Sequence, residues 1–358
     1  MKQVALKDIC IKGSSPYKQK ELLADGRFAV YGASGIAGYL DSYAQETNYI
    51  GIVKDGSGIG RVNFYPAKTS LIGTMQYILP KNGYDIRYIG YCLKSLDLSK
   101  YKQGAAIPHI YFKDYGERIV RIVEDEKEQQ RIVERLDAAF AHIDELKANA
   151  EKQLSEARVL FQKALEKAME PKEGWKMKTI NDVASFRNGV AHEKEIDKDG
   201  KYIVINSKFV SSDGTVRKYT NEVLSPLFVD DIVMVMSDVP KGKTLAKCFI
   251  VDKNDKYSLN QRICAFQSKG VYIRFLYYML NRNTNLLKYD NGENQTNLRK
   301  KQILECPVFY PNSKSEQQRI VARLDSLSAH VRELEEINKK LIAECDALKQ
   351  ALLRKVFE

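Results

Sequence analysis

The chain lacks the features that mark membrane, secreted or metal-binding proteins. No stretch approaches the run of about eighteen apolar residues that a membrane-spanning helix needs. The first residues, MKQVAL, lack the apolar centre of a secretory signal. The six cysteines are scattered without CxxC spacing, which argues against a zinc site and a disulfide framework. We therefore expect a cytoplasmic protein with reduced thiols, no metal and no membrane association.

Motifs of three enzyme classes are also missing. Segment 237–244, SDVPKGKT, ends like a nucleotide-binding P-loop, but Ser237 stands where that loop needs glycine, and a strand-like segment follows it. The chain has no Pro-Pro pair, which a base-binding methyltransferase motif would contain. The acidic run 124–126 could suggest a metal nuclease, but the dipole of a helix favours acidic residues at its start without any metal. We expect no catalytic residue and no cofactor in this chain.

Positive charge is concentrated outside two segments that read as helices. The chain has 57 basic and 46 acidic residues, a net charge of +11. Residues 124–170 contain 12 acidic and 8 basic residues, and residues 316–358 contain 8 of each, so the remainder carries +15. A polyanion binds such a surface by releasing its counterions, which makes nucleic acid the first partner to consider.

The chain repeats itself at long range. Segment 128–137, EQQRIVERLD, returns as 316–325, EQQRIVARLD, at an offset of 188 residues. Near the front of each half, 25–28, DGRF, corresponds to 199–202, DGKY, at an offset of 174. The halves are therefore diverged copies, and the second carries a net fourteen additional residues between these landmarks.

Each EQQRIV segment opens a long helix with a narrow apolar seam. Apolar residues recur at steps of three and four over five to six heptads, which is typical of a coiled coil. Each helix should run about 40 residues, or about 60 Å. One helix cannot bury its seam alone, so we expect the two to pair as an antiparallel coiled coil; homodimerisation through the same seams is the alternative. The predicted seam residues are Ile132, Leu136, Phe140, Ile143, Leu154, Phe161, Ile320, Leu324, Leu327, Val331, Leu334, Leu341, Leu348 and Leu352.

The remaining segments predict two similar α+β domains. Short runs rich in β-branched and aromatic residues alternate with Asp-Gly and Asn-Gly turns. Strands are expected at 202–205, YIVI, and 232–236, IVMVM, and a short helix at 271–280. The predicted order is a domain over 1–123, a long helix over 124–170, a domain over 171–314 and a long helix over 315–358.

Taken together, these features resemble the specificity (S) subunits of type I restriction-modification systems. The resemblance spans the chain, since both halves are diverged basic domains followed by a long helix opening with EQQRIV. Its further motifs are the front segments 5–9, ALKDI, and 179–183, TINDV, the glycine-rich 31–39, YGASGIAGY, the turns 58–61 and 241–244, and Asn260-Gln261. Their order and duplication carry the resemblance.

The resemblance implies a DNA-reading subunit without catalytic activity. Each domain would be a target-recognition domain that reads one half of a bipartite site in double-stranded DNA, and the helices would set the spacing between half-sites. In that family the S subunit joins two methyltransferase (M) subunits, and restriction/translocase (R) subunits complete the enzyme. S-adenosylmethionine and ATP would then belong to those partners.

Candidate DNA-binding residues lie in the predicted turns. Lysine and arginine beside glycine suit close approach to phosphates, and asparagine or glutamine can pair with adenine through two hydrogen bonds. In the first domain the candidates are Gly32, Gly35, Lys54, Ser57 and Arg61. In the second they are Ser207, Lys208, Lys241, Lys243, Asn260, Gln261 and Arg262.

Two other functions are consistent with part of the sequence. A coiled-coil scaffold that bridges proteins without reading DNA would bind DNA weakly and without salt sensitivity. A self-sufficient DNA-modifying enzyme would need motifs that this chain lacks.

Overall fold

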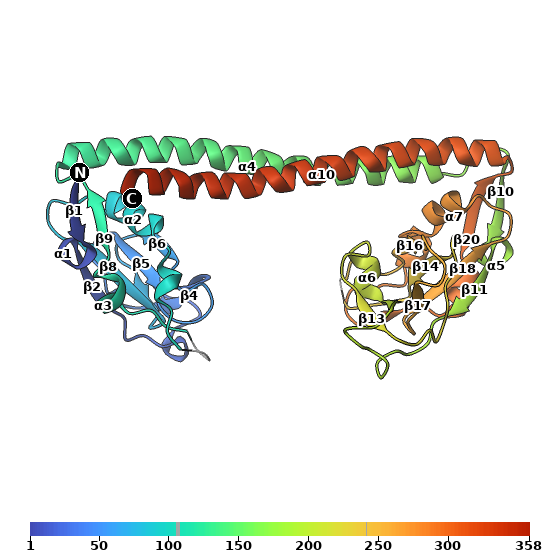
Figure 1. The fold of residues 1–358 in the computed structure, drawn as a ribbon, viewed down its shortest axis with the longest axis horizontal. Coiled ribbons are helices and arrows are strands. Elements are labelled where there is room, and N and C mark those ends of the chain that lie inside the picture. Colours follow the sequence, from blue (N-terminus) through green and yellow to red (C-terminus); the bar gives the residue numbers. More distant parts are fainter. Residues whose placement is uncertain (105–107, 241) are drawn as a thin grey trace. The chain divides into compact units, whose positions relative to one another are not determined.

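The computed structural model describes residues 1–104, 108–240 and 242–358 (Figure 1). The chain divides into two compact units, one formed by Met1–Leu154 with Glu336–Glu358 and the other by Ser155–Glu335. Each unit therefore contains one globular domain and a part of both long helices, α4 (Glu126–Met169) and α10 (Lys314–Phe357).

The first domain contains a four-stranded sheet, a three-stranded sheet and a strand pair that leads into α4. Their strand orders are β2-β8-β5-β6, β4-β3-β7 and β1-β9, and β3 runs parallel to β7. The elements are β1 (Lys2–Ala5), α1 (Leu6–Ile9), β2 (Cys10–Ser14), η1 (Gln19–Glu21), β3 (Phe28–Gly32), β4 (Gly35–Leu40), β5 (Tyr49–Val53), β6 (Val62–Tyr65), β7 (Ser70–Leu71), β8 (Met75–Pro80), α2 (Ile86–Ser95), η2 (Leu98–Tyr101), α3 (Phe112–Tyr115) and β9 (Ile119–Ile122).

The second domain repeats this topology. The orders are β11-β18-β14-β16, β13-β12-β17 and β10-β20, with an additional pair β15-β19, and β12 runs parallel to β17. The elements are β10 (Trp175–Thr179), α5 (Ile180–Val183), β11 (Ala184–Asn188), β12 (Tyr202–Ile205), α6 (Ser207–Ser211), β13 (Lys218–Thr220), β14 (Ile232–Val235), β15 (Ser237–Asp238), β16 (Cys248–Ile250), β17 (Tyr257–Leu259), β18 (Ile263–Ser268), α7 (Ile273–Leu280), α8 (Thr284–Leu287), β19 (Thr296–Asn297), α9 (Lys300–Leu304) and β20 (Pro307–Pro311).

The α+β fold with two similar domains and two long helices is confirmed. The predicted strand at 202–205 is β12, the one at 232–236 is β14, and the predicted helix at 271–280 is α7. These segments are recognisable because buried strands are runs of β-branched residues, whereas the helix is longer and amphipathic.

The additional residues of the second half lie in one stretch of the domain. Tyr31 pairs with Leu71 in the parallel ladder of the first domain, and Ile205 pairs with Leu259 in the second. The offset between the copies is 174 at the first strand and 188 at the next, so the fourteen net residues lie between these two strands. The sheets are conserved between the copies, and the connections between them are not.

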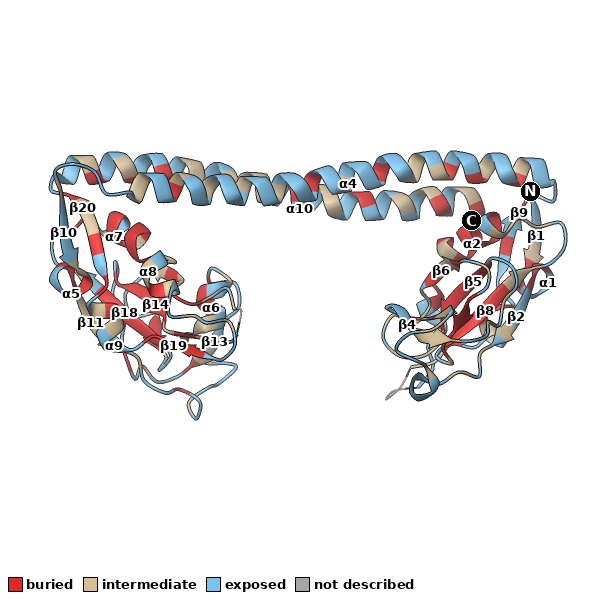
Figure 2. Ribbon diagram, turned by 180° about the vertical axis from the view of Figure 1, so that it is seen from behind, coloured by how far each residue is buried: buried red, intermediate tan, exposed pale blue. Residues whose placement is uncertain are grey.

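The repeated EQQRIV helix starts pack into the core of their own domain. Val133 and Leu136 are buried together with Leu353 and Phe357 in the core of the first domain. In the second domain, Val321 and Leu324 are buried with Leu165. Figure 2 shows buried positions spaced along α4 and α10, with exposed positions between them. The helix pair is thus part of each domain's core.

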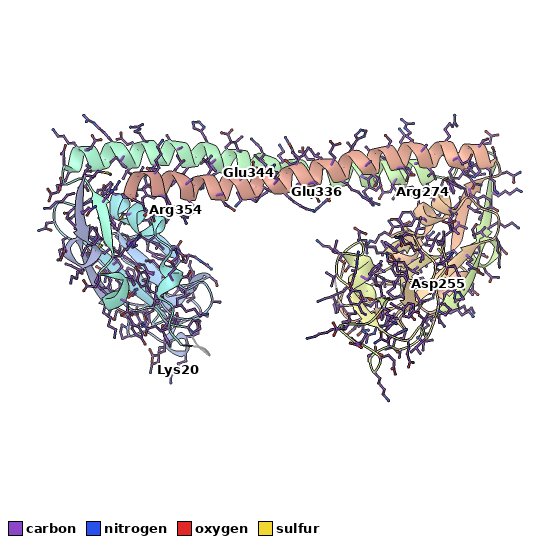
Figure 3. All side chains as sticks on the ribbon, in the orientation of Figure 1. Lys20, Asp255, Arg274, Glu336, Glu344 and Arg354 are labelled. Carbon is purple, nitrogen blue, oxygen red and sulfur yellow. The ribbon has the colours of Figure 1, made fainter. Side chains whose placement is uncertain are left out.

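Two hydrogen-bond networks recur at these junctions. Arg87 donates to Asp137 at 2.6 Å, and Tyr91 donates to the same carboxylate. In the second unit, Arg274, labelled in Figure 3, donates to Asp325 at 2.7 Å, and Tyr278 donates to it at 2.6 Å. The repeated Asp at the end of the motif therefore holds α2 or α7 against the long helix.

In each unit, α4 and α10 pack antiparallel. In the first unit, Lys147 Nζ lies 2.8 Å from Asp346 Oδ1, and Lys349 Nζ lies 2.5 Å from Asp144 Oδ1. Figure 1 shows the start of α4 beside the end of α10. In the second unit, Arg158 Nε lies 2.7 Å from Glu335 Oε1.

One predicted seam residue lies outside the seam. Leu348 is 49% exposed, whereas the other thirteen are buried or half-buried. The seam passes through Cys345, Lys349 and Leu353 instead, because Lys349 lies over the ring of Phe140 at 5.4 Å. The simple apolar pattern could not reveal that a lysine stem covers this turn.

The described residues contain no helix long and apolar enough to cross a membrane, and no cluster of potential metal ligands. All six cysteines are buried and free. Burial raises the pKa of the Cys10 thiol to about 12 and that of Cys306 to about 11. The thiols of Cys10 and Cys306 are therefore protonated, unreactive core side chains.

Candidate nucleic-acid interface

In the first domain, three connections meet at one edge of the sheets. They are the β3–β4 turn at 33–34, the β5–β6 loop at 54–61 and the β7–β8 connection at 72–74. Arg61 Nη1 donates to Ala33 O at 3.0 Å, which joins the loop to the turn. Lys54 N donates to Thr74 O at 3.0 Å, which joins the loop to the third connection. The structure therefore brings Gly32, Gly35 and Arg61 together.

Glycines allow the backbone of the β5–β6 loop to turn closely beneath Arg61. Gly58 has φ +87°, and a Cβ there would lie 2.4 Å from Arg61 Nη2. A side chain at this position would be strained and would also displace the guanidinium. The exposed Arg61 is thus held by the loop rather than extended freely into solvent.

The base of this loop is held by an acidic side chain. His109 Nδ1 and Asp55 Oδ1 are 2.5 Å apart, and Lys54 Nζ lies 3.7 Å from the same carboxylate group. Lys54 is half-buried, whereas Ser57 at the loop tip is exposed. Because Asp55 compensates its charge, Lys54 offers less to an anion than the exposed Arg61 does.

In the second domain, the parallel β12–β17 pair places its following segments at one edge. Asn260 N donates to Ile205 O at 3.2 Å, next to Ser207 and Lys208 at the start of α6. Met236 N donates to Arg262 O at 3.0 Å, which brings the β14–β16 loop to the same edge. The edge therefore contains 206–208, 236–240, 242–247 and 260–262, and Lys208, Gln261 and Arg262 are exposed there.

Asp238 closes the β14–β16 loop. It accepts hydrogen bonds from Val239 N at 2.9 Å, Thr244 N at 2.6 Å and Leu245 N at 3.1 Å. Burial disfavours its charge, but the hydrogen bonds outweigh burial and hold the pKa of Asp238 below its usual value. The loop thus presents Lys243, which is exposed. Lys241 lies outside the described residues.

The structure adds residues that the sequence did not indicate. Gln261 Nε2 donates to Glu193 Oε1 at 2.8 Å, so the 188–196 segment also lies at this edge. Val190 N donates to Leu259 O at 3.0 Å and keeps that segment against β17. In the first domain, 72–74 is the counterpart of 260–262. The offset of 188 would have identified 72–74, but no sequence signal identifies Glu193.

This arrangement suits the binding of a nucleic acid. Exposed basic and amide side chains stand on short connections whose ends are held by two sheets. Such connections can grip phosphates and contact base edges. They are also the parts of the fold that differ between the copies, since the β5–β6 loop covers 54–61 and its counterpart covers 236–247.

Comparison with known proteins gives one family and several similar folds. The family described as "Type I restriction modification DNA specificity domain" matches residues 1–156 and 172–343. No curated protein matches the chain in sequence. A chain from a structure on "complex assembly and conformational transition of the type I R-M system" is 15% identical with a TM-score of 0.77, over 99% of this chain and 96% of that one.

Two further solved structures are similar. The HsdS subunit from Thermoanaerobacter tengcongensis is 16% identical with a TM-score of 0.54, over 99% of this chain and 95% of that chain. A type I restriction-modification S subunit from M. genitalium is 17% identical with a TM-score of 0.45, over 100% and 96%. The first of these two supports the fold.

Proposed function

The chain belongs to the family of type I restriction-modification DNA specificity domains and recognises DNA sequence, and from that premise we propose that it reads a bipartite site with one half-site per domain. The observation that carries this proposal is the contrast within each domain. The sheet frame and its contacts to the long helices are repeated, whereas the connections at the candidate edge differ in sequence and two of the three also differ in length. Two frames with different loops would read two different half-sites.

The candidate residues divide by chemistry into two roles. Arg61, Lys208 and Lys243 are exposed cations, which suit phosphate contacts that position each domain. Asn260, Gln261 and Arg262 follow one another beside β18 and carry the groups that pair with adenine or guanine edges. Glu193, which accepts from Gln261, would orient that amide and could accept a hydrogen bond from cytosine.

The long helices would set the distance between half-sites. Each spans 44 residues, about 66 Å at about 1.5 Å per residue. Because each domain packs on both helices, a change of length would have to be made in both to keep the packing. Such a paired insertion should lengthen the spacer in the recognised sequence without changing either half-site.

Methyltransferase subunits would dock on exposed apolar residues of the helices. In the first unit these are Leu146, Ile337 and Leu348, which are 52%, 56% and 49% exposed, and in the second Val159 and Leu160, 51% and 61% exposed. Catalysis, S-adenosylmethionine and ATP would belong to M and R subunits, and this chain would contribute no catalytic residue.

The proposal is tested by methylation in cells. The chain is co-expressed with a compatible type I methyltransferase subunit, and methylated adenines in host DNA are mapped by sequencing. A bipartite motif should appear only when the chain is present. Exchanging Asn260 and Gln261 for alanine should change the bases accepted in one half-site only, whereas Lys208→Ala should reduce methylation evenly across sites.

Two results would contradict the proposal. Methylation that stays the same when the chain is omitted would show that the chain does not select the methylated sites. A change in both half-sites on exchanging Asn260 and Gln261 would show that the domains do not read separately. The first result would make a protein scaffold the better explanation, whereas the second would leave a DNA-reading subunit whose two domains act together.

A further inference from the structure

Two interhelical ion pairs occupy positions that are related by the internal repeat. At the offset of 188, Arg158 of α4 corresponds to Asp346 of α10, and Lys147 corresponds to Glu335. The pair Lys147–Asp346 of the first unit is therefore the repeat counterpart of the pair Glu335–Arg158 of the second. Both pairs are attractive. At each of the two repeat positions, however, α4 carries the positive charge and α10 carries the negative charge. At these two repeat positions the helices are thus alike in packing and opposite in charge.

This reversal acts against pairing of either helix with a second copy of itself. In a symmetric pair of α4 helices, 148–170 of one copy would replace the equivalent 336–358 of α10. Lys147 would then face Arg158 of that second copy. In a symmetric pair of α10 helices, Asp346 would face Glu335. Both contacts are repulsive, and each would occur twice in the dimer.

The third interhelical pair gives no attraction to self-pairing either. Lys349 binds Asp144 at 2.5 Å in the first unit. The repeat counterparts of these residues are Phe161 and Arg332. Self-pairing of α10 would place Lys349 against Arg332, and self-pairing of α4 would place Asp144 against Phe161. These three pairs are therefore lost when like helices meet.

We propose that these charges make the two halves of this protein recognise each other and reject a second copy of themselves. The apolar seam alone distinguishes the helices poorly, because many of its positions are apolar in both copies, such as Ile132 with Ile320 and Leu136 with Leu324. Charges flanking a seam are known to select coiled-coil partners through attraction in the right pair and repulsion in the wrong one. The partner of each half is the other half of the same chain.

The test uses the whole protein with one connection opened. The chain is split in 170–174, after α4, and both halves are produced together so that every residue is present. The first half carries two different tags in the same cells. Recovery of one tagged first half with the other measures self-pairing, and recovery of the second half measures the native pairing. With the native charges, native pairs should dominate.

Charge exchange then removes and restores the discrimination. Lys147→Glu with Asp346→Lys keeps both native pairs attractive, but makes both kinds of self-pair attractive at 147–158 and 335–346. Self-pairing should increase about tenfold or more relative to native pairing. Adding Arg158→Glu and Glu335→Arg makes like helices repel again at these positions, so native pairing should return. The net charge is the same in all three proteins.

Several outcomes would overturn the proposal. One is self-pairing of the native halves as readily as in the double variant. Another is a fourfold variant that self-pairs as much as the double variant. If the opened chain does not assemble, the intact chain gives a second measurement. There Lys147→Glu should lower the melting temperature, and adding Asp346→Lys should restore it. If the melting temperature is not restored, the two side chains do not interact.

Discussion

The two globular domains agree closely where they meet the long helices and differ where they carry exposed connections. Asp137 accepts from Arg87 and Tyr91, and Asp325 accepts from Arg274 and Tyr278 in the same way. By contrast, the two-residue turn of the first domain at 33–34 corresponds to 206–217 in the second, which contains α6. Contacts to a shared helix pair constrain both copies equally. Connections that face outward carry no such constraint, so they can diverge.

The largest effect is expected from shortening the core leucines of the repeated motif. Leu136→Ala and Leu324→Ala should each lower the free energy of unfolding of their own unit by about 3 kcal/mol, because both are buried and leave a cavity. Hydrogen exchange followed by mass spectrometry reports each unit separately. Leu146→Ala, at an exposed position, is the control with little effect. If only one of the two substitutions lowered the stability of its unit, the repeated leucine would not have the same role in both domains.

Somewhat smaller losses of stability are expected on replacing the two buried glutamines, and the two losses should differ. Gln129 accepts from Asp85 N and donates to Gly83 O and Val123 O, whereas Gln317 accepts from Tyr272 N and donates to Pro311 O. Replacement by leucine leaves buried backbone groups without partners.

We expect a loss of about 3 kcal/mol for Gln129→Leu and about 2 kcal/mol for Gln317→Leu, since the first breaks more hydrogen bonds. Unit-resolved hydrogen exchange measures both. The matched control is Gln130→Leu, which is exposed in the same turn of α4. A larger loss at Gln317 would show that counting hydrogen bonds does not rank these sites.

The paired aspartates should have a similar but smaller effect. Asp137→Asn and Asp325→Asn should each cost about 1 kcal/mol at neutral pH, because these pairs are partly exposed to water. Burial, and then the hydrogen bond to Asp137, raise the pKa of Tyr91 to about 12.

A raised tyrosine pKa stabilises the folded state below the unfolded value near 10, and this contribution is lost as the pH rises towards 12. Asp137→Asn should therefore weaken the fall in stability between these pH values. Urea unfolding of the first unit at pH 8, 10 and 11.5 measures it. An unchanged slope would mean that burial alone sets the pKa of Tyr91.

The smallest expected change is an increase in stability. Asn338 is 2% exposed in the seam, and its Nδ2 has no hydrogen-bond partner among the described residues. Its repeat counterpart is Ala150, which is equally buried. Asn338→Leu should raise the stability of the first unit by about 1 kcal/mol, as removal of a buried polar group from a helix seam does. Calorimetry would show this as a higher melting temperature, and a lower one would indicate that the amide is satisfied.

Much of the candidate site followed from the sequence, because turns are recognisable from their local residues. Glycines, lysines and amides between β-rich runs indicated the connections that hold Gly32, Arg61, Lys208 and Asn260. What could not be predicted was which connections meet. Arg61 reaches Ala33, and Gln261 reaches Glu193, only because strands far apart in the chain are neighbours.

The repeat, the two long helices, the strands predicted at 202–205 and 232–236 and the family all follow from the sequence, because periodicity and duplication are properties of the chain order alone. The recurrence of Gln129, Leu136 and Asp137 is explained only by the tertiary structure. Gln129 and Asp137 bind Asp85 and Arg87, up to fifty residues away along the chain, and Leu136 is buried with Leu353 from the far end of the chain. The tertiary structure also decided that Lys349 rather than Leu348 continues the seam. The physical reason is that a pattern specifies which face is apolar, whereas the partner on that face comes from packing of distant segments.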